Sequence, residues 1–220
     1  MEAKKAAAEL AVAEIREGMI VGLGTGSTAY WAIQGLGARV RNGLNIQAVA
    51  TSEASENLAK ELGIPLIAFA NISEIDVTID GADEVDAAWN LIKGGGGALL
   101  REKIVAFSSR KLIIVVDESK VVAQLGAFPL PVEVVKFGYE LTIRRLRALG
   151  CKPEVRVVDR QPFLTDNGNY IIDCNFGSIP NPAGLHQAIN GIPGVVETGL
   201  FIGMASQVIV GYKDGSVERL

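Results

Sequence analysis

Short apolar runs alternate with helical patterns from the beginning of the chain to about residue 120. The opening segment, residues 1–15, has helical spacing with charges throughout, which is typical of a first helix and not of a signal peptide. Four β-branched runs follow it, at residues 19–24, 45–52, 75–83 and 111–119. Helical patterns separate these runs, at residues 28–40, 53–63 and 98–110. The alternation predicts parallel βαβ units and therefore an α/β fold with a Rossmann-like, doubly wound, mostly parallel sheet.

The pattern changes at residues 126–135, where Pro129 and Pro131 mark the end of the first half of the chain. A separate strand and helix are predicted after them. Two extended runs joined by a TDNGN turn come next, and then a short helix and a strand. This βαββαβ order predicts a second, smaller ferredoxin-like α+β domain. The tail reads strand, Asp-Gly turn, strand, and we expect it to return to the first sheet. The predicted domains are therefore residues 1–128 plus 205–220, which form the Rossmann-like domain, and residues 129–204, which form the small one.

Composition narrows the class of partner. The chain has 220 residues, a net charge of −4 and a pI near 5.2, so it offers no basic surface for nucleic acid or an anionic membrane. No stretch approaches membrane-spanning length. The two cysteines, Cys151 and Cys174, lie outside any CxxC pattern, which argues against a disulfide framework or zinc ribbon and fits half-buried thiols in a reducing compartment. We expect a cytoplasmic protein with a small soluble ligand.

The first predicted strand runs into a glycine turn, TGST, that opens the next helix. Backbone N–H groups at a helix N-terminus, with the hydroxyls of Ser27 and Thr28 beside them, form a site for an anion such as phosphate. Two alternatives stay open. Gly24, Gly26 and Ala29 match the dinucleotide pattern G-x-G-x-x-A, with Glu53 placed where a ribose-binding acid would be. The turn is also compatible with a tight strand-to-helix connection that binds nothing.

Two carboxylates, Asp80 and Asp83, follow the third predicted strand, and both are expected to face one pocket at its end. Three roles are compatible with this position: the two aspartates cap the next helix, bind Mg²⁺ through their oxygens, or carry protons to a polyol substrate. The only histidine, His186, lies in the other half of the chain and is interpreted as a helix-surface residue. This weakens the metal interpretation.

A glycine-rich loop after Lys93 brings backbone N–H groups and a positive charge near a ligand, although it is also compatible with a flexible loop and a solvated lysine. Glu102 falls early in the following helix, where taken alone it is interpreted as an ordinary surface acid between Arg101 and Lys103. Taken together, the phosphate turn, the two aspartates, Lys93 and Glu102 indicate a proton-transfer site for a sugar phosphate.

Seven segments carry a family resemblance: GLGTGSTA, DGADEVD, LIKGGGGALLREKIVA, VDESK, FPLPVEV, TDNGN and IPGVVETGLF. In this order they resemble the ribose-5-phosphate isomerase A family over nearly the whole chain. The resemblance implies the interconversion of D-ribose 5-phosphate and D-ribulose 5-phosphate in the non-oxidative branch of the pentose phosphate pathway. It also implies that no metal or organic cofactor is used and that the protein is a homodimer or homotetramer.

Carried over residue by residue, the resemblance implies that Glu102 is the general base of a cis-enediolate mechanism, with Asp80, Asp83 and Lys93 as further catalytic residues. The substrate-binding residues that it implies are Thr25, Gly26, Ser27, Thr28, Asp80, Gly81, Ala82, Asp83, Lys93, Gly94, Gly95, Gly96 and Lys120. Lys4 or Lys5 is a further candidate for the phosphate. A fourth glycine, Gly97, departs from the family pattern and leaves the shape of the loop open.

Three alternative functions remain at this point. A nicotinamide-dependent dehydrogenase explains the TGST turn and Glu53 but gives no role to the second glycine loop or to Glu102. A non-catalytic sugar-phosphate sensor would use the same kind of sheet. A deaminase or CoA transferase of related fold fits the combined motifs less well.

Overall fold

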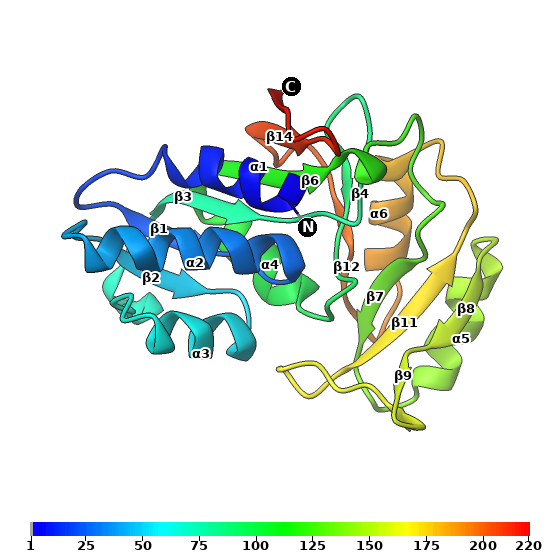
Figure 1. The fold of residues 1–220 in the computed structure, drawn as a ribbon. Coiled ribbons are helices and arrows are strands. Elements are labelled where there is room, and N and C mark those ends of the chain that lie inside the picture. The colour runs from blue at the N-terminus through cyan, green and yellow to red at the C-terminus, as the bar shows by residue number, and fades with distance from the viewer. Residues whose placement is uncertain (1) are drawn as a thin grey trace. The chain divides into compact units, whose positions relative to one another are not determined.

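The computed structural model describes residues 2–220 and divides into two compact units. Unit 1 contains the described residues up to Ala82, together with Arg101–Val121 and Met204–Leu220, and unit 2 contains Asp83–Leu100 and Val122–Gly203. Figure 1 shows the helices and strands of both units.

Unit 1 is built on a six-stranded sheet in the order β15-β14-β6-β3-β1-β2. Every neighbouring pair is parallel except β14 and β15. The predicted mostly parallel sheet is therefore confirmed. Its strands are β1 (Ile20–Leu23), β2 (Gln47–Ala50), β3 (Ile75–Asp80), β6 (Ser109–Asp117), β14 (Gln207–Gly211) and β15 (Val217–Arg219).

Helices lie on both faces of this sheet, as Figure 1 shows for α1 and α2 in front and α4 behind. On the first face, Ala8 and Ile33 join the core made by alternate strand residues such as Val115. On the second face, α4 comes so close to β1 that a Cβ at Gly22 would lie 2.8 Å from a methyl group of Val105. The helices are α1 (Glu2–Val12), α2 (Ser27–Arg41), α3 (Glu53–Glu61) and α4 (Leu99–Phe107), with short 3-10 turns η1 (Phe69–Asn71) and η2 (Glu118–Lys120).

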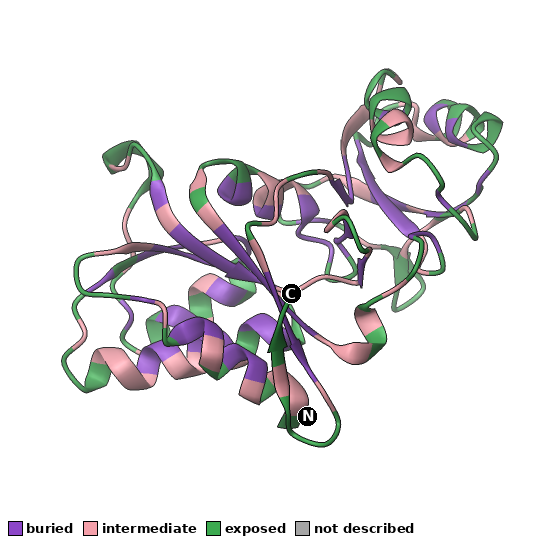
Figure 2. Cartoon of the chain, turned by 90° about the horizontal axis from the view of Figure 1, so that it is seen from above, coloured by how far each residue is buried: buried purple, intermediate pink, exposed green. Residues whose placement is uncertain are grey.

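The buried positions follow from this layering. In Figure 2 the strands at the centre of the large sheet are mostly buried. In β6, residues 112–116 are buried in succession, as expected for a strand covered on both faces. Among the described residues, no helix combines the length and the apolar character needed to cross a bilayer.

The C-terminal segment returns to this sheet, as predicted, because β14 pairs with β6 and β15 pairs with β14. The close packing of α1 on β14 depends on Gly211, where an added Cβ would lie 2.1 Å from the carbonyl oxygen of Ala3. The lack of a side chain at Gly211 therefore lets the first turn of α1 lie directly on β14.

Unit 2 contains an antiparallel four-stranded sheet in the order β12-β7-β11-β8. Its elements follow in the order strand, helix, strand, strand, helix, strand, and the ferredoxin-like prediction is confirmed. Cys151 and Cys174 lie in its core at 4% and 0% exposure, so the expectation of half-buried thiols was wrong. The elements are β7 (Leu130–Val134), α5 (Tyr139–Ala148), β8 (Lys152–Val155), β11 (Tyr170–Asn175), α6 (Pro182–Asn190) and β12 (Val195–Thr198).

Two smaller sheets complete unit 2. One joins β4 (Glu84–Val85), β5 (Leu91–Ile92) and β13 (Leu200–Phe201), and the other joins β9 (Val157–Val158) and β10 (Gln161–Pro162). Because β5 pairs with β13, residues 83–100 fall in unit 2, whereas the predicted domains placed them in the Rossmann-like domain. Glu84 holds residues 126–128 there as well, since its carboxylate accepts hydrogen bonds from the N–H groups of Gly126 and Phe128 at 2.7 and 2.6 Å.

Candidate active site

Three of the predicted site segments lie at one edge of the large sheet. The TGST turn follows β1, Asp80 ends β3, and the segment from Asp117 to Lys120 follows β6. These three strands are parallel neighbours, so their carboxyl ends meet at the same edge. The sequence-based expectation for this part of the site therefore agrees with the fold of unit 1.

The TGST turn leaves the N-terminus of α2 without a side-chain cap. Its N-cap, Gly26, has φ of +102°, a conformation that L-residues with side chains rarely adopt. Helix α3 differs, because the hydroxyl of Ser52 accepts a hydrogen bond from the N–H of Ser55 at 3.1 Å. The first turn of α2 thus has no side-chain cap, whereas that of α3 is capped within the protein.

Thr25 holds the turn in place through its side chain. Its hydroxyl lies 2.7 Å from that of Thr51 and donates to Ser52 at 2.8 Å. The hydroxyl of Ser55 in turn donates to the carbonyl of Gly24 at 2.6 Å. The hydroxyl of Thr25, proposed from the resemblance to bind substrate, is therefore engaged in the connection to the β2–α3 turn.

Asp80 ties the same turn to the end of β3. Its side chain is 1% exposed, and Oδ1 accepts hydrogen bonds from the N–H groups of Thr25 at 3.1 Å and Gly81 at 2.8 Å. The approach requires a glycine directly after β1, because a Cβ at Gly24 would lie 2.2 Å from this oxygen. Asp80 is thus a structural hydrogen-bond acceptor that holds the TGST turn.

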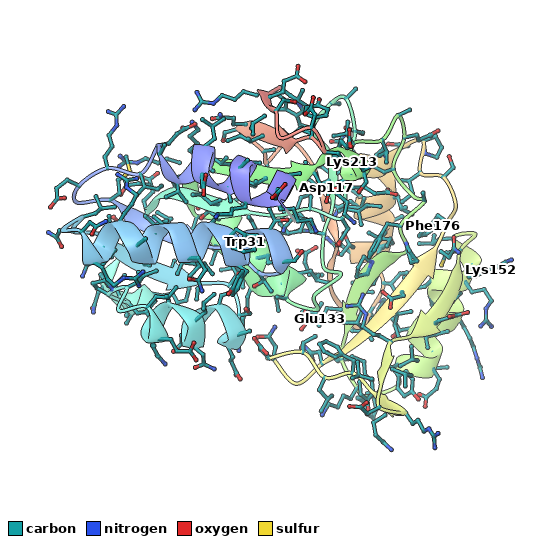
Figure 3. All side chains as sticks on the ribbon, viewed as in Figure 1. Trp31, Asp117, Glu133, Lys152, Phe176 and Lys213 are labelled. Carbon is teal, nitrogen blue, oxygen red and sulfur yellow. The ribbon has the colours of Figure 1, made fainter. Side chains whose placement is uncertain are left out.

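Lys4 reaches the TGST turn from α1. Its ammonium donates to the hydroxyl of Ser27 at 3.0 Å and lies 3.6 Å from the carboxylate of Asp117, which Figure 3 labels. Lys5 points elsewhere, with its ammonium 3.9 Å from Glu9. The sequence left both Lys4 and Lys5 as candidates for the phosphate, and the packing of α1 brings the Lys4 ammonium, not that of Lys5, to the TGST turn.

The carboxylate of Asp117 is held ionised by this environment. Burial acts to raise its pKa, but hydrogen bonds from Ser119 and the charges of Lys4 and Lys120 outweigh burial, so the pKa lies below its ordinary value. A charged Asp117 balances the cations of this edge and fixes the direction in which Lys4 points.

Asp83, Lys93 and the glycine loop lie in unit 2, whereas Glu102 lies in unit 1. Asp83 accepts a hydrogen bond at Oδ2 from the N–H of Gly95 at 2.8 Å, so it holds the glycine loop much as Asp80 holds the TGST turn. The two aspartates were expected to face one pocket. Asp80 ends β3 in unit 1, and Asp83 is the first residue of unit 2.

Packing within unit 2 explains three of the four glycines in the loop. Gly94 has φ of +101° and Gly97 has φ of +80°. A Cβ at Gly97 would lie 2.4 Å from the ring of Phe163, and one at Gly95 would lie 2.6 Å from Asp83. The structure therefore favours a loop of defined shape over a flexible one, and Gly97 is part of that shape.

Lys93 and Glu102 are both buried, which surface interpretations of these residues did not predict. Lys93 is 2% exposed and its ammonium lies 5.4 Å from the ring centroid of Phe201 in unit 2. Glu102 is 4% exposed in the first turn of α4. The interpretations of Lys93 as a solvated lysine and of Glu102 as an ordinary surface acid were therefore wrong. Burying a charged group costs free energy, so both positions favour a functional role over a purely structural one.

Other candidates receive structural roles. Glu53, weighed as a ribose-binding acid, lies 4.0 Å from the guanidinium of Arg101. His186 is half-buried and its Nδ1 lies 2.9 Å from the hydroxyl of Thr198. Within residues 2–220, no three His, Cys, Asp or Glu side chains gather in an arrangement suited to a metal ion.

Comparison with known proteins places this arrangement in a family. Residues 47–215 match the family model described as ribose 5-phosphate isomerase A (phosphoriboisomerase A). Ribose-5-phosphate isomerase A of Bacillus mycoides is 56% identical over 219 residues, covering 99% of both chains.

Solved structures agree. Ribose 5-phosphate isomerase from Plasmodium falciparum superposes with a TM-score of 0.96 at 40% identity, covering 100% of this chain and 98% of that one. A D-ribose-5-phosphate isomerase in complex with phospho-erythronic acid gives the same TM-score at 41% identity, covering 100% and 97%. The chain therefore belongs to the ribose-5-phosphate isomerase A family of aldose–ketose isomerases.

Proposed function

We propose that this chain interconverts D-ribose 5-phosphate and D-ribulose 5-phosphate through a cis-enediolate, with Glu102 as the general base. The observation that carries the proposal is the position of Glu102, a glutamate 4% exposed in the first turn of α4, directly after the glycine loop. A carboxylate removed from water is a stronger base than one on the surface.

The reaction moves one proton between neighbouring carbons. Glu102 takes the proton from C2 of the open-chain aldose, and the electrons of the C–H bond form the enediolate, whose negative charge develops on the oxygen at C1. The protonated Glu102 then returns a proton to C1, while a hydroxyl proton moves from O2 to O1. One base above one face of a planar cis-enediolate reaches both carbons.

The developing negative charge is balanced by Lys93 and by N–H groups of the glycine loop, residues 94–96. Asp83 orients sugar hydroxyls or Lys93 in this proposal, and Asp80 helps to open the furanose ring and moves the proton between hydroxyl oxygens. One relative supports the charge assignment, since it is solved with phospho-erythronic acid, whose carboxylate is planar and anionic like an enediolate.

The substrate phosphate binds at the N-terminus of α2, with Lys4 and Lys120 as cationic partners. The uncapped first turn and the ammonium of Lys4, 3.0 Å from the Ser27 hydroxyl, support this assignment. Binding energy from the phosphate, remote from the reacting carbons, fixes their orientation.

We predict that Lys4→Met weakens inhibition by inorganic phosphate about tenfold or more, because it removes a charge-assisted hydrogen bond. Lys5→Met is the matched control, since it lies one residue away on α1 and points to Glu9. Inhibition constants for phosphate and thermal melting curves of both variants provide the measurement. Equal inhibition constants in Lys4→Met and wild type would remove Lys4 from the phosphate site.

Proton transfer through the enediolate is tested by running the isomerisation in D₂O with EDTA present. After many turnovers, NMR is expected to show solvent deuterium at C1 of ribulose 5-phosphate and at C2 of ribose 5-phosphate, because a protonated carboxylate exchanges with water. A direct hydride shift carries the original hydrogen, so product free of deuterium at both carbons would contradict the proposal.

We further propose, from the family resemblance, that the chain acts in the non-oxidative branch of the pentose phosphate pathway as a homodimer or homotetramer. Its composition favours a location in the cytoplasm. It is expected to need no metal or organic cofactor, because proton transfer uses the side chains named above.

A further inference from the structure

The four-stranded sheet of unit 2 has two chemically different faces. Alternation along the strands places Val132, Val134 and Ile172 in the core that is completed by Leu146 of α5 and Ile189 of α6. The intervening residues point to the opposite face. These include Pro131, Glu133, Ile171 and Asp173, which face one another in register across β7 and β11.

Polar groups on this second face hold neighbouring segments. Glu133, labelled in Figure 3, is fully buried, and its Oε1 accepts hydrogen bonds from side chains of the TDNGN turn, including Thr165 at 3.0 Å and Asn169 at 2.9 Å. Phe163, two residues before that turn, packs against Gly97. The glycine loop is thus docked beside the second face, through contacts that lie entirely within unit 2.

Arg156 makes the most specific contact with the loop. Its Nε and Nη2 donate to the two carboxylate oxygens of Asp173 at 2.9 and 2.5 Å, a bidentate pair. Its Nη1 donates to the carbonyl oxygens of Gly94 at 2.9 Å and Gly95 at 3.0 Å. The side chain is 14% exposed, so Asp173 and the sheet hold the guanidinium in a fixed plane.

The hydrogen bonds from Arg156 to the two carbonyls determine the orientation of the loop peptides. In a trans peptide the carbonyl and the N–H of the same peptide plane point in opposite directions. When Arg156 holds the carbonyls of Gly94 and Gly95, the N–H groups of Gly95 and Gly96 point away from it. The N–H of Gly95 does so and donates to Asp83 at 2.8 Å.

We propose that Arg156 is a positioning residue for the isomerisation, which keeps the N–H of Gly96 turned toward the substrate and the loop carbonyls turned away from it, while the N–H of Gly95 stays on Asp83. The inference rests on the proposed function, because it assumes that the Gly96 N–H helps to balance the enediolate charge. If the Gly95–Gly96 peptide flipped, its carbonyl dipole would face the enediolate and oppose its formation. Preoriented dipoles stabilise developing charge without reorganisation during the reaction.

The charge of Arg156 adds a second effect. A cation on the carbonyl side polarises the peptide and makes its N–H a stronger donor. Lysine keeps the charge but cannot satisfy the Asp173 carboxylate and two carbonyls with one planar group. Arg156→Lys therefore separates the geometry of the fork from its charge.

We expect Arg156→Lys and Arg156→Ala to lower kcat about 10²-fold, the usual cost of losing an oxyanion donor, with KM changed less than threefold. Millimolar methylguanidinium is expected to restore part of the activity of Arg156→Ala. Arg144→Ala on the exposed side of α5 is the matched control and should keep wild-type kinetics. Urea unfolding of each variant measures the folded fraction.

The outcomes separate the explanations. Wild-type kcat in Arg156→Lys, or activity loss that only follows the folded fraction, would overturn the inference. If Arg156→Ala does not fold, Asp173→Asn replaces it and should lower kcat in the same direction by a smaller factor. Deuterium uptake by the wild-type enzyme tests the proposed function independently, so a failure there is distinguishable from a failure confined to Arg156.

Discussion

Replacing Glu102 with glutamine is expected to lower kcat for ribose 5-phosphate isomerisation by about 10³-fold or more, because the amide cannot accept the C2 proton and the usual contribution of a positioned base is 10²–10⁴-fold. Glutamine has nearly the same shape as glutamate, so the change removes basicity and leaves the packing of α4 largely intact. The side chain is 4% exposed, and neutralising a buried carboxylate lowers the cost of burying it. The variant should therefore fold.

Substrate binding should survive in Glu102→Gln. The phosphate contacts assigned to the α2 N-terminus and Lys4 do not involve Glu102. The inhibition constant for inorganic phosphate is therefore expected to stay within about threefold of wild type, whereas a loss of 1.4 kcal/mol in binding free energy would change it about tenfold. Ketose formation from ribose 5-phosphate in the presence of EDTA measures kcat, and competition with phosphate measures binding. Loss of both activity and phosphate inhibition would indicate a structural defect.

The matched control is Glu61→Gln, at the exposed C-terminal residue of α3. It makes the same chemical change at a position that the proposed mechanism does not use, and wild-type kinetics are expected. Activity of Glu102→Gln equal to that of this control would assign the base to another residue.

Gly24→Ala is expected to have the largest effect on the stability of unit 1, lowering the free energy of unfolding by about 3 kcal/mol. The added Cβ would lie 2.2 Å from the Asp80 carboxylate and 2.6 Å from the Asp80 Cα, and a backbone atom cannot move aside cheaply. Relief requires β1 and β3 to separate at their carboxyl ends. That movement would also break the hydrogen bond from the Thr25 N–H to Asp80, so phosphate inhibition should weaken in the same variant.

Gly35→Ala provides the control for this substitution. Gly35 lies within α2, and a Cβ there would contact Val12 at an ordinary 3.5 Å. Alanine in a helix interior is favoured over glycine by about 0.5–1 kcal/mol, so this variant is expected to be as stable as wild type or slightly more stable. Chemical denaturation followed by circular dichroism compares the two. A Gly24→Ala protein as stable as Gly35→Ala would show that the close contact between Gly24 and Asp80 does not determine the turn.

Much of the fold could be predicted because its signals are local. The β-branched runs at residues 19–24 and 111–119 became β1 and β6, and the helical spacing of residues 28–40 became α2. Strands covered on both faces have continuous apolar sequences, and the helices between them have apolar residues that recur with a period near 3.6. The βαββαβ order of the second half likewise predicted its antiparallel sheet, since few topologies satisfy that order.

The boundary near residues 83–100 could not be predicted in the same way. Strands β4 and β5 have two residues each, too short for a periodic pattern, and their partner β13 lies more than a hundred residues later. Pairing between distant short segments depends on tertiary packing and leaves little trace in the local sequence.

For the candidate site, too, the identity of several residues could be predicted from the sequence but their surroundings could not. Position after a strand was enough to single out Asp80 and Asp83, and the adjacent glycine loop singled out Lys93. Glu102 became a candidate only together with these residues and through the family resemblance. Their environments were not readable. Burial of Lys93 and Glu102 and the inward turn of the Thr25 hydroxyl came only from the structure. Arg156 gave no signal at all, because it follows an edge strand in an ordinary alternating run.

The sequence by itself determined the class of fold and the family, and it located the glycine turn that opens α2, because each depends on residue types at fixed spacing along a few neighbouring positions. Only the tertiary structure decided which lysine of α1 reaches Ser27, which aspartate holds which loop, and which side chain orients the glycine peptides. Those contacts join residues 12 to 62 positions apart, and they form only when packing brings the segments within hydrogen-bond distance.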